Sequence, residues 1–515
     1  MCRRADGATH RHTADHRPHS LPPQSAHTGH FRQVRQHQPY AAQSRSHPEA
    51  LHSPAYRALQ PLPGSGRYYH PRRYDALPAP IRRETLPGNM LRHSPCHPIR
   101  KSRLAVKRAC FFCTFALTTI VCDNMITFTL DNNETILLAA TGLFFLIQIY
   151  FYTQLYLRIP RHKKDVEHGK IIFTDDCPPL SVILYAHESF ERIQTSLPAI
   201  LQQDYPQFEV IVVTDGTDDG TSDYLTQLRA NHPHLHHSFI PDSSRYISHK
   251  KLALTLGIKA ARYDWIVMTE TNCYPASDQW LRLLARNLTP GTEIVLGYSN
   301  YEQSKSWFHK YYIAYDNLLQ AMRYLGSALK GSPYMGIGRN LLYNKKMFYK
   351  NKGFSKYLNL LRGDDDLFIN QVAKKKNTRV ETDTRAIVHH LPLVQTKEWR
   401  EEKIGYTSTA RLYKGLQRYI IGFETTTRLL FHACWGYTAT IAIILHHWPA
   451  MSIAITFFLV RWMLQIYVIN KNAQAISDSQ SYYFTLPLFD VLQPIQSFRW
   501  KLHCLLRRKS EFMRK

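Results

Sequence analysis

Short apolar runs alternate with helical patterns through the middle of the chain. Residues 180–186, 208–214 and 263–269 are nearly continuous apolar runs, the pattern of strands buried on both faces of a parallel sheet. A helical pattern at 190–203 follows the first run and ends at a turn that contains proline. This alternation predicts an α/β fold, with a Rossmann-like, mostly parallel sheet and flanking helices.

Polar groups stand where these predicted strands end. The second run stops at Asp215, which opens a turn rich in glycine and aspartate, and the third leads into Glu270, Thr271 and Asn272. The carboxyl ends of parallel strands meet at one edge of an open sheet, where ligands bind. We therefore expect one pocket at this edge, of a kind suited to a nucleotide sugar.

Two longer apolar regions flank the central part. Residues 136–157 are uncharged and long enough to cross a hydrocarbon core of ~30 Å at ~1.5 Å per residue. Residues 429–469 are predicted to form two further transmembrane helices, because polar residues and a proline at 446–449 break the region. Basic residues follow the first span, so the positive-inside rule predicts that 158–428 is cytoplasmic. Arg461 lies within the last span, where it needs a partner helix or a water-filled path.

The two ends of the chain carry weaker signals. Residues 1–108 are rich in His, Arg, Pro, Ser and Gln without apolar periodicity, which predicts disorder. Met125 begins a stretch that resembles an ordinary start, which favours mis-assigned upstream translation. If Met1 is the start, the apolar residues 110–122 are a signal-like or extra span. Residues 486–515 are predicted to form a short interfacial helix or packed loop, followed by a basic cytoplasmic tail.

Composition narrows the classes of function. The chain has 515 residues, 44% of them hydrophobic, which is enough for a folded core and a few membrane spans. Its net charge of +26 would suit nucleic acid, but the basic residues gather in the first hundred positions and beside the membrane segments. They also lack interleaved aromatic residues, so we expect no nucleic-acid partner. The nine cysteines follow no regular spacing, which favours inert thiols.

Four ordered segments carry a resemblance to a known family: LSVILYAHES, LPAILQQDYPQFEVIVVTDGTDDGT, SHKKLALTLGIKAARYDWIVMTETNCYP and RGDDDLFIN. Together they resemble family 2 of the glycosyltransferases, with its GT-A fold, over residues 178–413. The resemblance is strongest to membrane-anchored bacterial members that build cell-envelope glycans. It implies an inverting hexosyltransferase that moves a sugar from a nucleotide-diphosphate donor, a UDP-sugar, to a lipid-linked or envelope glycan acceptor. It also implies the inner, cytoplasmic membrane, several spans and a cytoplasmic catalytic domain.

The resemblance assigns the nucleotide side of the pocket to the first two strand ends. In family members a carboxylate like that of Asp215 contacts the uracil, whose N3–H needs an acceptor. An Asx turn at Asp215 is the structural alternative. The residues that close the first strand are expected to line the same side: Ala186, His187 and Glu188. Here the chain departs from the family, which usually has Arg-Asn-Glu where this chain has His187-Glu188-Ser189.

A basic pair and an altered acidic triplet are assigned to the donor's diphosphate. Lys250 and Lys251 resemble the family's donor-side motif at a helix start, with a solvated basic face as the alternative. Family members hold Mg²⁺ or Mn²⁺ with Asp-x-Asp at the end of the fourth strand, because the leaving diphosphate gains negative charge. Here Glu270 and Asn272 take those places, keep oxygen ligands and lose one charge. An ordinary capping turn is the alternative for this triplet.

An acidic cluster resembles the family's catalytic motif. The acceptor hydroxyl needs a base opposite the leaving nucleotide, and Asp365 aligns with that base beside Asp364. Adjacent like charges raise a pKa toward useful basicity when they are partly buried. An acidic N-cap ahead of a helix at 367–373 is the alternative, and it is compatible with catalysis.

A later stretch resembles the family's acceptor-side segment. Trp399 is kept and Lys403 is assigned to the acceptor side, whereas Glu402 stands where glutamine is usual and Ile404 where a cation is usual. Together with the altered triplet, these departures leave a second function open. That alternative is a catalytically degenerate member that binds nucleotide sugar or acts as a scaffold in a glycan-assembly complex. The expected partners are therefore a nucleotide-sugar donor, a lipid-linked or glycan acceptor and the membrane.

Overall fold

A computed structural model describes residues 131–216, 219–240, 248–476 and 480–506. The expectations for residues 1–108, for the start at Met125, for the apolar residues 110–122 and for the basic tail beyond 506 lie outside these residues. All statements below concern the described part of the chain.

The larger sheet has seven strands in the order β3-β2-β1-β4-β8-β6-β9. The strands are β1 (Leu180–Ala186), β2 (Phe208–Thr214), β3 (Leu235–Phe239), β4 (Trp265–Met268), β6 (Ile294–Leu296), β8 (Leu341–Asn344) and β9 (Thr378–Val380). The first four strands in this order pair in parallel, and β8 runs antiparallel to both of its neighbours. The mostly parallel α/β sheet predicted from the apolar runs is therefore confirmed.

A smaller sheet lies at the carboxyl side of β4. It consists of β5 (Cys273–Pro275), β10 (Val388–His390) and β7 (Ser299–Tyr301), with β10 in the centre. The strand β10 pairs antiparallel with β5 and in parallel with β7. Because β5 starts directly after Asn272, the altered acidic triplet joins the two sheets.

Each face of the larger sheet is buried in a separate apolar core, as alternating side-chain direction requires. Val182 and Leu184 pack with α4 (Phe190–Leu201) and α7 (Trp280–Ala285), whereas Ile183 packs with α6 (His249–Ala260). The approach of α6 is close: a Cβ on Gly257 would lie 2.7 Å from Ile183 Cγ2. The first turn of α6 is thereby held at the carboxyl ends of β1 and β2.

The remaining helices of the α/β part lie between and around the sheets. They are α5 (Thr221–Asn231), η2 (Phe308–Ile313), α8 (Ala314–Leu329), α9 (Lys345–Lys350), η3 (Ser355–Tyr357), α10 (Asp366–Val372), η4 (Thr384–Ala386) and α11 (Thr396–Ala410). The helix predicted at 367–373 is confirmed as α10 within one residue at each end. The helix predicted at 190–203 is confirmed as α4.

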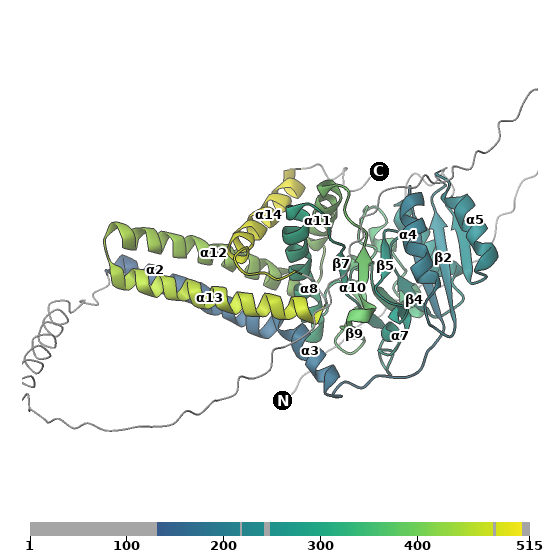
Figure 1. Cartoon of the computed structure of the whole chain (residues 1–515), viewed down its shortest axis with the longest axis horizontal. Coiled ribbons are helices and arrows are strands. Elements are labelled where there is room, and N and C mark those ends of the chain that lie inside the picture. Colours follow the sequence, from purple (N-terminus) through teal and green to yellow (C-terminus); the bar gives the residue numbers. More distant parts are fainter. Residues whose placement is uncertain (1–130, 217–218, 241–247, 477–479, 507–515) are drawn as a thin grey trace, which may run out of the picture. The chain divides into compact units, whose positions relative to one another are not determined.

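Three long helices pack against one another beside the α/β part (Figure 1). They are α2 (Asn132–Phe151), α12 (Gln417–Ile444) and α13 (Trp448–Ala475). The first continues through a π-helical turn, η1 (Tyr152–Tyr156), into α3 (Arg158–Glu167). The break predicted at 446–449 is confirmed in part, because α12 ends at Ile444 but α13 already begins at Trp448.

Two of the described helical segments are long and apolar enough to cross a membrane. They are residues 132–167 and α13, and in each only 28% of the apolar window is buried against the protein. The helix α12, predicted from residue 429 onward, is not among them and begins much earlier, at Gln417. Its first half carries the charged residues Glu424 and Arg428, which explains why apolar periodicity did not reveal its start.

The last described helix, α14 (Leu486–Leu506), is longer than the short interfacial helix expected at its start. One side of it is buried, through Phe489 and Trp500, while Leu488 and Phe498 are exposed. Such an amphipathic helix suits a membrane surface, although its position relative to a membrane stays a prediction.

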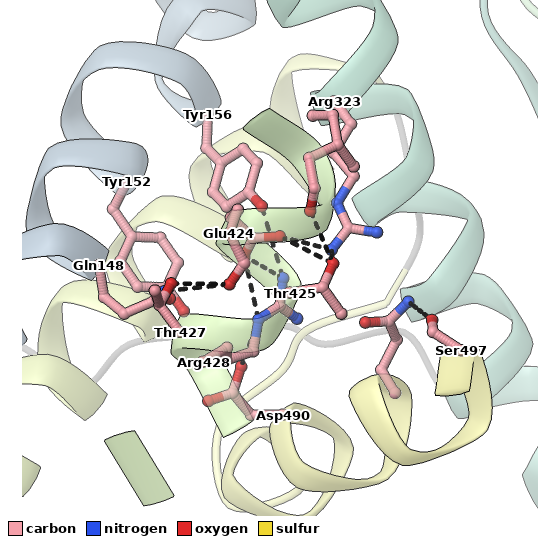
Figure 2. Close-up of polar contacts among 12 residues, drawn as sticks. Gln148, Tyr152, Tyr156, Arg323, Glu424, Thr425, Thr427, Arg428, Asp490 and Ser497 are labelled. Carbon is pink, nitrogen blue, oxygen red and sulfur yellow. Dashed lines mark hydrogen bonds and ion pairs between the residues drawn. The ribbon is translucent and has the colours of Figure 1, made fainter. Parts of the chain in front are cut away.

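Buried charges join α8, α12, α13 and α14; we call Arg323, Glu424, Arg428, Arg461 and Asp490 the junction cluster. All five are at most 9% exposed. Glu424 Oε2 lies 2.6 Å from Arg323 Nη2, and its other carboxylate oxygen pairs with Arg428. Figure 2 shows Arg323, Glu424 and Arg428 converging below Tyr156, with Asp490 close to Arg428.

Arg461 has the partner that its position within an apolar helix predicted. An arginine inside an apolar helix was expected to need a partner, and Arg461 Nη2 lies 2.6 Å from Asp490 Oδ2. The same carboxylate oxygen lies 2.7 Å from His432 Nε2. The helix α14 therefore supplies the counter-ion for α13, which ties the C-terminal helix to the apolar bundle.

We expect Glu424→Gln to destabilise the protein strongly. The substitution leaves Arg323 and Arg428 buried without their shared carboxylate, and breaking a buried ion pair in this way costs about 3–5 kcal/mol. The apparent melting temperature of detergent-purified protein measures the loss. The matched control is Glu401→Gln, because that exposed side chain makes only a 4.0 Å contact with Lys397. Equal melting temperatures for the two variants would contradict the role given to the cluster.

Candidate active site

The carboxylate of Asp215 lies at the carboxyl end of β2, where it was predicted. Only 3% of the residue is exposed. Tyr185 donates a hydrogen bond of 2.9 Å to its Oδ2, and the Nδ1 of His187 is in close contact with the same oxygen. The Nδ1 of His249, in the first turn of α6, lies 4.0 Å away. Asp215 thus lies beside the imidazole groups of two histidines, and its contact with a uracil base stays a prediction.

The loop after β1 is tied to both neighbouring strand ends. Ala186 is buried at the end of β1, whereas His187 and Glu188 are exposed. Glu188 has a left-handed backbone, with φ 43°, a conformation that non-glycine residues rarely adopt outside functional loops. The three residues predicted to bind the donor therefore form one short loop over the sheet edge.

Ser189 fastens this loop in place. Its backbone N–H donates to Asp219 Oδ2 at 2.8 Å, and its hydroxyl accepts a bond of 3.2 Å from Thr271. Asp219 follows β2 and Thr271 follows β4, so the three strand ends share one hydrogen-bonded network. Asp219 was not predicted as a site residue, although it stands four residues after Asp215 in the same acidic turn.

Lys250 stands at the centre of the site. Its Nζ lies 2.8 Å from Glu270 Oε1 and 3.1 Å from Asp364 Oδ2. Burial alone would lower the pKa of Lys250, but the carboxylates of Asp364 and Glu270 raise it above its ordinary value. The pKa of Glu270 falls to about 2, because Lys250 and Arg339 outweigh the opposing effect of burial. Lys250 and Glu270 are therefore both charged at neutral pH.

Lys251 has a different task from its neighbour. It is fully buried, and its Nζ donates to the carbonyl oxygens of Tyr357, Leu360 and Arg362 at 2.5, 2.7 and 2.8 Å. Three acceptors use all three donors of an ammonium group. Donor binding by Lys251 stays a prediction, but in this structure the side chain instead holds the loop that leads into Asp364.

Asn272 is oriented by a histidine. His390 Nδ1 lies 2.6 Å from the carbonyl oxygen of Leu391, so Nδ1 carries the proton and Nε2 accepts from Asn272 Nδ2 at 2.8 Å. The amide oxygen of Asn272 then has only the Cys273 thiol as a donor, at 3.3 Å. This oxygen remains suited to a hard cation.

The residues fit a divalent cation that is held jointly with a ligand. The donor set consists of the Glu270 and Asp364 carboxylates and the Asn272 amide oxygen, and the buried Asp364 Oδ2 accepts no hydrogen bond despite its 3.1 Å ion pair. Among the described residues no three His, Cys, Asp or Glu side chains cluster as a metal site. Mg²⁺ typically uses one or two carboxylates and completes its shell with substrate phosphates and water. The Mg²⁺ or Mn²⁺ prediction is therefore compatible with the side chains present.

The three consecutive aspartates diverge in their contacts. Asp365 caps α10, and its Oδ2 accepts bonds from Gly338 N at 2.9 Å and Tyr406 Oη at 2.8 Å. Burial and the charge of Asp364 raise the pKa of Asp365 above its ordinary value. Asp366 is fully buried and accepts a bond of 2.7 Å from Tyr413. Asp365 is thus the member with both a raised pKa and a position beside the Lys250 pair.

A second set of charges lies beside this group. Glu402 Oε2 accepts bonds from Arg339 Nη1 at 2.8 Å and Tyr301 Oη at 2.7 Å, so a carboxylate that departs from the family pattern is neutralised. Burial opposes the charge of Arg362, yet the negative groups around it, Glu402 first, raise its pKa. Neither Arg339 nor Arg362 was predicted from the sequence. Arg362 directly precedes the acidic cluster and could have been found there, whereas nothing local marks Arg339.

Trp399 and Lys403 are buried in contacts with other helices. Trp399 is 3% exposed and packs edge-on against Trp500 of α14, with ring centroids 5.3 Å apart. Lys403 Nζ lies 2.7 Å from Asp316 Oδ2 of α8. An acceptor could reach either side chain only after these contacts opened, so their acceptor-side role stays a prediction and their role in this structure is to fasten α11.

An open, mostly parallel sheet with carboxylates and a lysine at its carboxyl edge has the architecture of a GT-A domain. Residues 181–351 match the family model described as Glycosyl transferase family 2. The chain therefore carries a family 2 glycosyltransferase domain; the match includes the first three of the four ordered segments, apart from Leu180, and ends before RGDDDLFIN at residues 362–370.

Curated relatives match short parts of the chain. The poly-beta-1,6-N-acetyl-D-glucosamine synthase of Staphylococcus epidermidis is 27% identical over 93 residues, which cover 18% of this chain and 21% of that protein. The enzyme of the same name from Staphylococcus aureus (strain COL) is 27% identical over 124 residues, which cover 24% and 28%. The chain thus matches less than a third of the length of these relatives.

Solved structures align at low similarity. The mannosyltransferase PcManGT from Pyrobaculum calidifontis, in complex with GDP-Man and Mn²⁺, is 13% identical with a TM-score of 0.42, and the alignment covers 66% of this chain and 99% of that one. S. aureus TarS 1–349 in complex with UDP-GlcNAc is 14% identical with a TM-score of 0.32, covering 62% and 91%. At these TM-scores neither structure bears on the chemistry of this chain.

The buried Asp366 generates a prediction about pH. Burial and the neighbouring Asp365 raise the pKa of Asp366 to about 7, so the folded protein keeps a proton that the unfolded chain loses near its ordinary pKa of 3.8. This contribution to stability is complete below that ordinary pKa and is lost as the pH rises toward about 7. Asp366→Asn does not titrate, so its melting temperature should rise relative to that of the wild type between about pH 4 and pH 7.

The control is Asp278→Asn, because Asp278 is exposed and far along the chain from the acidic cluster. Its melting temperature should track that of the wild type at every pH. A difference between Asp366→Asn and the wild type that stays constant with pH would contradict the raised pKa.

Proposed function

We propose that the chain is an inverting, membrane-anchored glycosyltransferase that takes a sugar from a UDP-sugar and transfers it to a lipid-linked or cell-envelope glycan acceptor. The observation that carries this proposal is the convergence of Asp215, the Lys250–Glu270 pair and Asp365 at the edge of one sheet. The family 2 match over residues 181–351 supports it. The names of the curated relatives make UDP-N-acetylglucosamine the first donor to test.

Asp365 is the proposed general base. The acceptor hydroxyl attacks the anomeric carbon, its proton passes to the Asp365 carboxylate, and the bond from the anomeric carbon to the diphosphate oxygen breaks. Direct displacement of this kind inverts the anomeric carbon. The raised pKa of Asp365 favours the proton transfer, and the bonds from Gly338 and Tyr406 keep the carboxylate oriented.

The other polar groups serve the donor. Asp215 and the loop of residues 186–188 are proposed to bind the base and ribose, with Asp215 as the acceptor for a base N–H. Glu270 and Asn272, with Asp364, would hold a divalent cation, which supplies positive charge for the leaving diphosphate. Lys250 and the start of α6 add a further positive field at the same place.

A catalytically silent member is the second candidate. Two observations favour it: both oxygens of Asp365 already accept hydrogen bonds, and Asn272 lacks the charge of the family's aspartate. Such a protein would bind nucleotide sugar, or hold a partner glycosyltransferase, without turnover. A binding assay and a turnover assay on the same preparation separate the two candidates.

The membrane arrangement is part of the proposal. The apolar faces of α2 and α13 would contact lipid, α12 would complete the bundle, and residues 158–428 would lie in the cytoplasm. The basic residues of α3 support this orientation under the positive-inside rule.

Asp215→Ala and Asp365→Asn should fail differently. Loss of the Asp215 acceptor should weaken UDP binding by roughly ten- to a hundred-fold, because a hydrogen bond to a charged group is lost. Asp365→Asn keeps the shape, so UDP affinity should survive while turnover falls by roughly two to four orders of magnitude. Titration calorimetry with UDP and transfer from radiolabelled UDP-sugar measure the two effects.

Asp264→Asn, an exposed aspartate that pairs with Lys346, is the matched control and should change neither quantity. A turnover rate in Asp365→Asn equal to that of the wild type would contradict the role of Asp365 as general base. Absence of turnover in the wild type, with UDP still bound, would favour the silent candidate.

The orientation can be tested with single cysteines. Gln202→Cys, in the exposed turn after α4, should be protected from an impermeant maleimide in intact cells. His446→Cys, in the exposed turn between α12 and α13, should react. The unsubstituted protein gives the background from its own cysteines. The reverse labelling pattern would invert the proposed topology.

A further inference from the structure

Two carboxylates of the site, those of Glu270 and Asp364, contact the same ammonium group, that of Lys250. Lys250 Nζ contacts one carboxylate from the triplet after β4 and one from the acidic cluster before α10, at 2.8 and 3.1 Å. Asp364 is buried, with 3% of its side chain exposed, whereas the side chains of Lys250 and Glu270 are 26% and 28% exposed. The ammonium therefore occupies the space between two carboxylates while it remains reachable from solvent.

The two carboxylates share one direct counter-ion. Glu270 and Asp364 each form an ion pair with Lys250, whereas the guanidinium groups of Arg339 and Arg362 act on this group of charges without a direct ion pair to either carboxylate. Asp364 Oδ2 lies within ion-pair distance of the ammonium but accepts no hydrogen bond in spite of its burial. A buried carboxylate oxygen without a hydrogen bond is costly, so this oxygen is better suited to a stronger cation than to the ammonium that now faces it.

The same oxygens form the donor set that fits a divalent cation, so an ammonium and such a cation would compete for them. An ammonium and a divalent cation cannot both sit between Glu270 and Asp364, because like charges at that separation repel. If the ammonium leaves the two carboxylates, the flexible side chain of Lys250 can still place it elsewhere at the same edge of the sheet. We expect the donor's diphosphate to lie at this edge and to become the new partner of the ammonium. The same diphosphate is the group that requires the divalent cation.

We propose that Lys250 is an exchangeable counter-ion. It holds Glu270 and Asp364 in the donor-free protein, yields both carboxylates when a divalent cation binds together with the nucleotide, and moves its ammonium to the nucleotide's diphosphate. This inference rests on the proposed function and adds a coupling to it. A cation alone must displace Lys250 without offering it a new partner, whereas a cation with a nucleoside diphosphate supplies one.

The coupling has a defined purpose in the reaction. Breaking the bond from the anomeric carbon to the diphosphate oxygen leaves an electron pair on that oxygen, and an ammonium beside it stabilises the added charge without giving up a proton. Lys250 is thus a positioning group for the cation site before donor binding and an electrostatic stabiliser of the leaving group afterwards. Without a donor, Lys250 stays paired with Glu270 and Asp364 and therefore weakens the binding of a divalent cation.

Binding of Mn²⁺, followed by the electron paramagnetic resonance signal of the free ion, tests the exchange on the full chain in detergent. In the wild type, Mn²⁺ alone should bind weakly, and saturating UDP should raise its affinity by roughly 5- to 150-fold after correction for binding of Mn²⁺ to free UDP. In Lys250→Met the carboxylates are unpaired, so Mn²⁺ alone should bind more tightly than to the wild type. UDP should then add less.

Two controls accompany this experiment. Lys259→Met removes an exposed lysine from the last turn of the same helix and should behave like the wild type. Lys250→Arg keeps a cation between the carboxylates and should keep the weak binding of Mn²⁺ alone. If Lys250→Met does not fold, the wild type and Lys250→Arg still carry the test, because both must show the gain in Mn²⁺ affinity on addition of UDP.

The outcomes separate this inference from the proposed function. If UDP binds but Mn²⁺ alone binds the wild type as tightly as Lys250→Met, the exchange is wrong and the nucleotide site stands. A UDP effect on Mn²⁺ affinity that is absent from the wild type overturns the exchange in the same way. If neither UDP nor GDP binds the wild type under any condition, the proposed function and the exchange both fail.

Discussion

A charged side chain that is buried away from water needs a partner of opposite charge. This constraint shapes both the apolar helical bundle and the edge of the larger sheet. In the apolar bundle, Glu424 pairs with Arg323 of α8 and with Arg428 of its own helix, whereas Asp490 of α14 pairs with basic groups from α12 and α13. At the sheet edge, Lys250 joins two carboxylates that stand nearly a hundred residues apart in the chain. Because a single unpaired buried ion would cost several kcal/mol, these pairings specify where the elements must meet.

The helix α11 connects the two ends. Its Tyr406 bonds to Asp365 at the sheet edge, its Lys403 pairs with Asp316 of α8, and its Trp399 packs on α14. The helix α14 in turn supplies Asp490 to the bundle. The proposed base therefore rests on a helix whose other faces are fixed by α8 and α14. The position of Asp365 depends on contacts far outside the acidic cluster.

Local patterns predicted the frame of the site well. The runs at 180–186 and 208–214 became β1 and β2 with unchanged bounds, since strands buried on both faces give an unambiguous apolar signal. The expectation that Asp215 and Glu270 lie at one edge of the sheet followed from the parallel order of the strands, whereas the acidic cluster was assigned by the resemblance to the family. The helix starting after Ser248 was also predicted, and Ser248 is its N-cap residue.

The partners of individual charges could not be predicted in the same way. Lys250 and Lys251 are adjacent and chemically identical, but successive residues of a helix point about 100° apart, so one reaches the carboxylates and the other the loop carbonyls. Arg339 comes from a turn before β8 and meets Glu402 only through the tertiary fold. The start of α12 was hidden because its buried ions interrupt the apolar pattern that marks a span.

The π-helical turn η1 lets one segment carry an extra residue without changing which faces of the neighbouring helices are buried. Residues Tyr152–Tyr156 take up that residue within one wider turn between α2 and α3, and Tyr152 and Tyr156 are both buried at the bundle core. Removing one residue there would restore regular α-helical winding and leave Ile159, which is fully buried, on the same face. A one-residue gap in this segment of an aligned homologue would therefore signal the loss of the π-turn and not a different bundle.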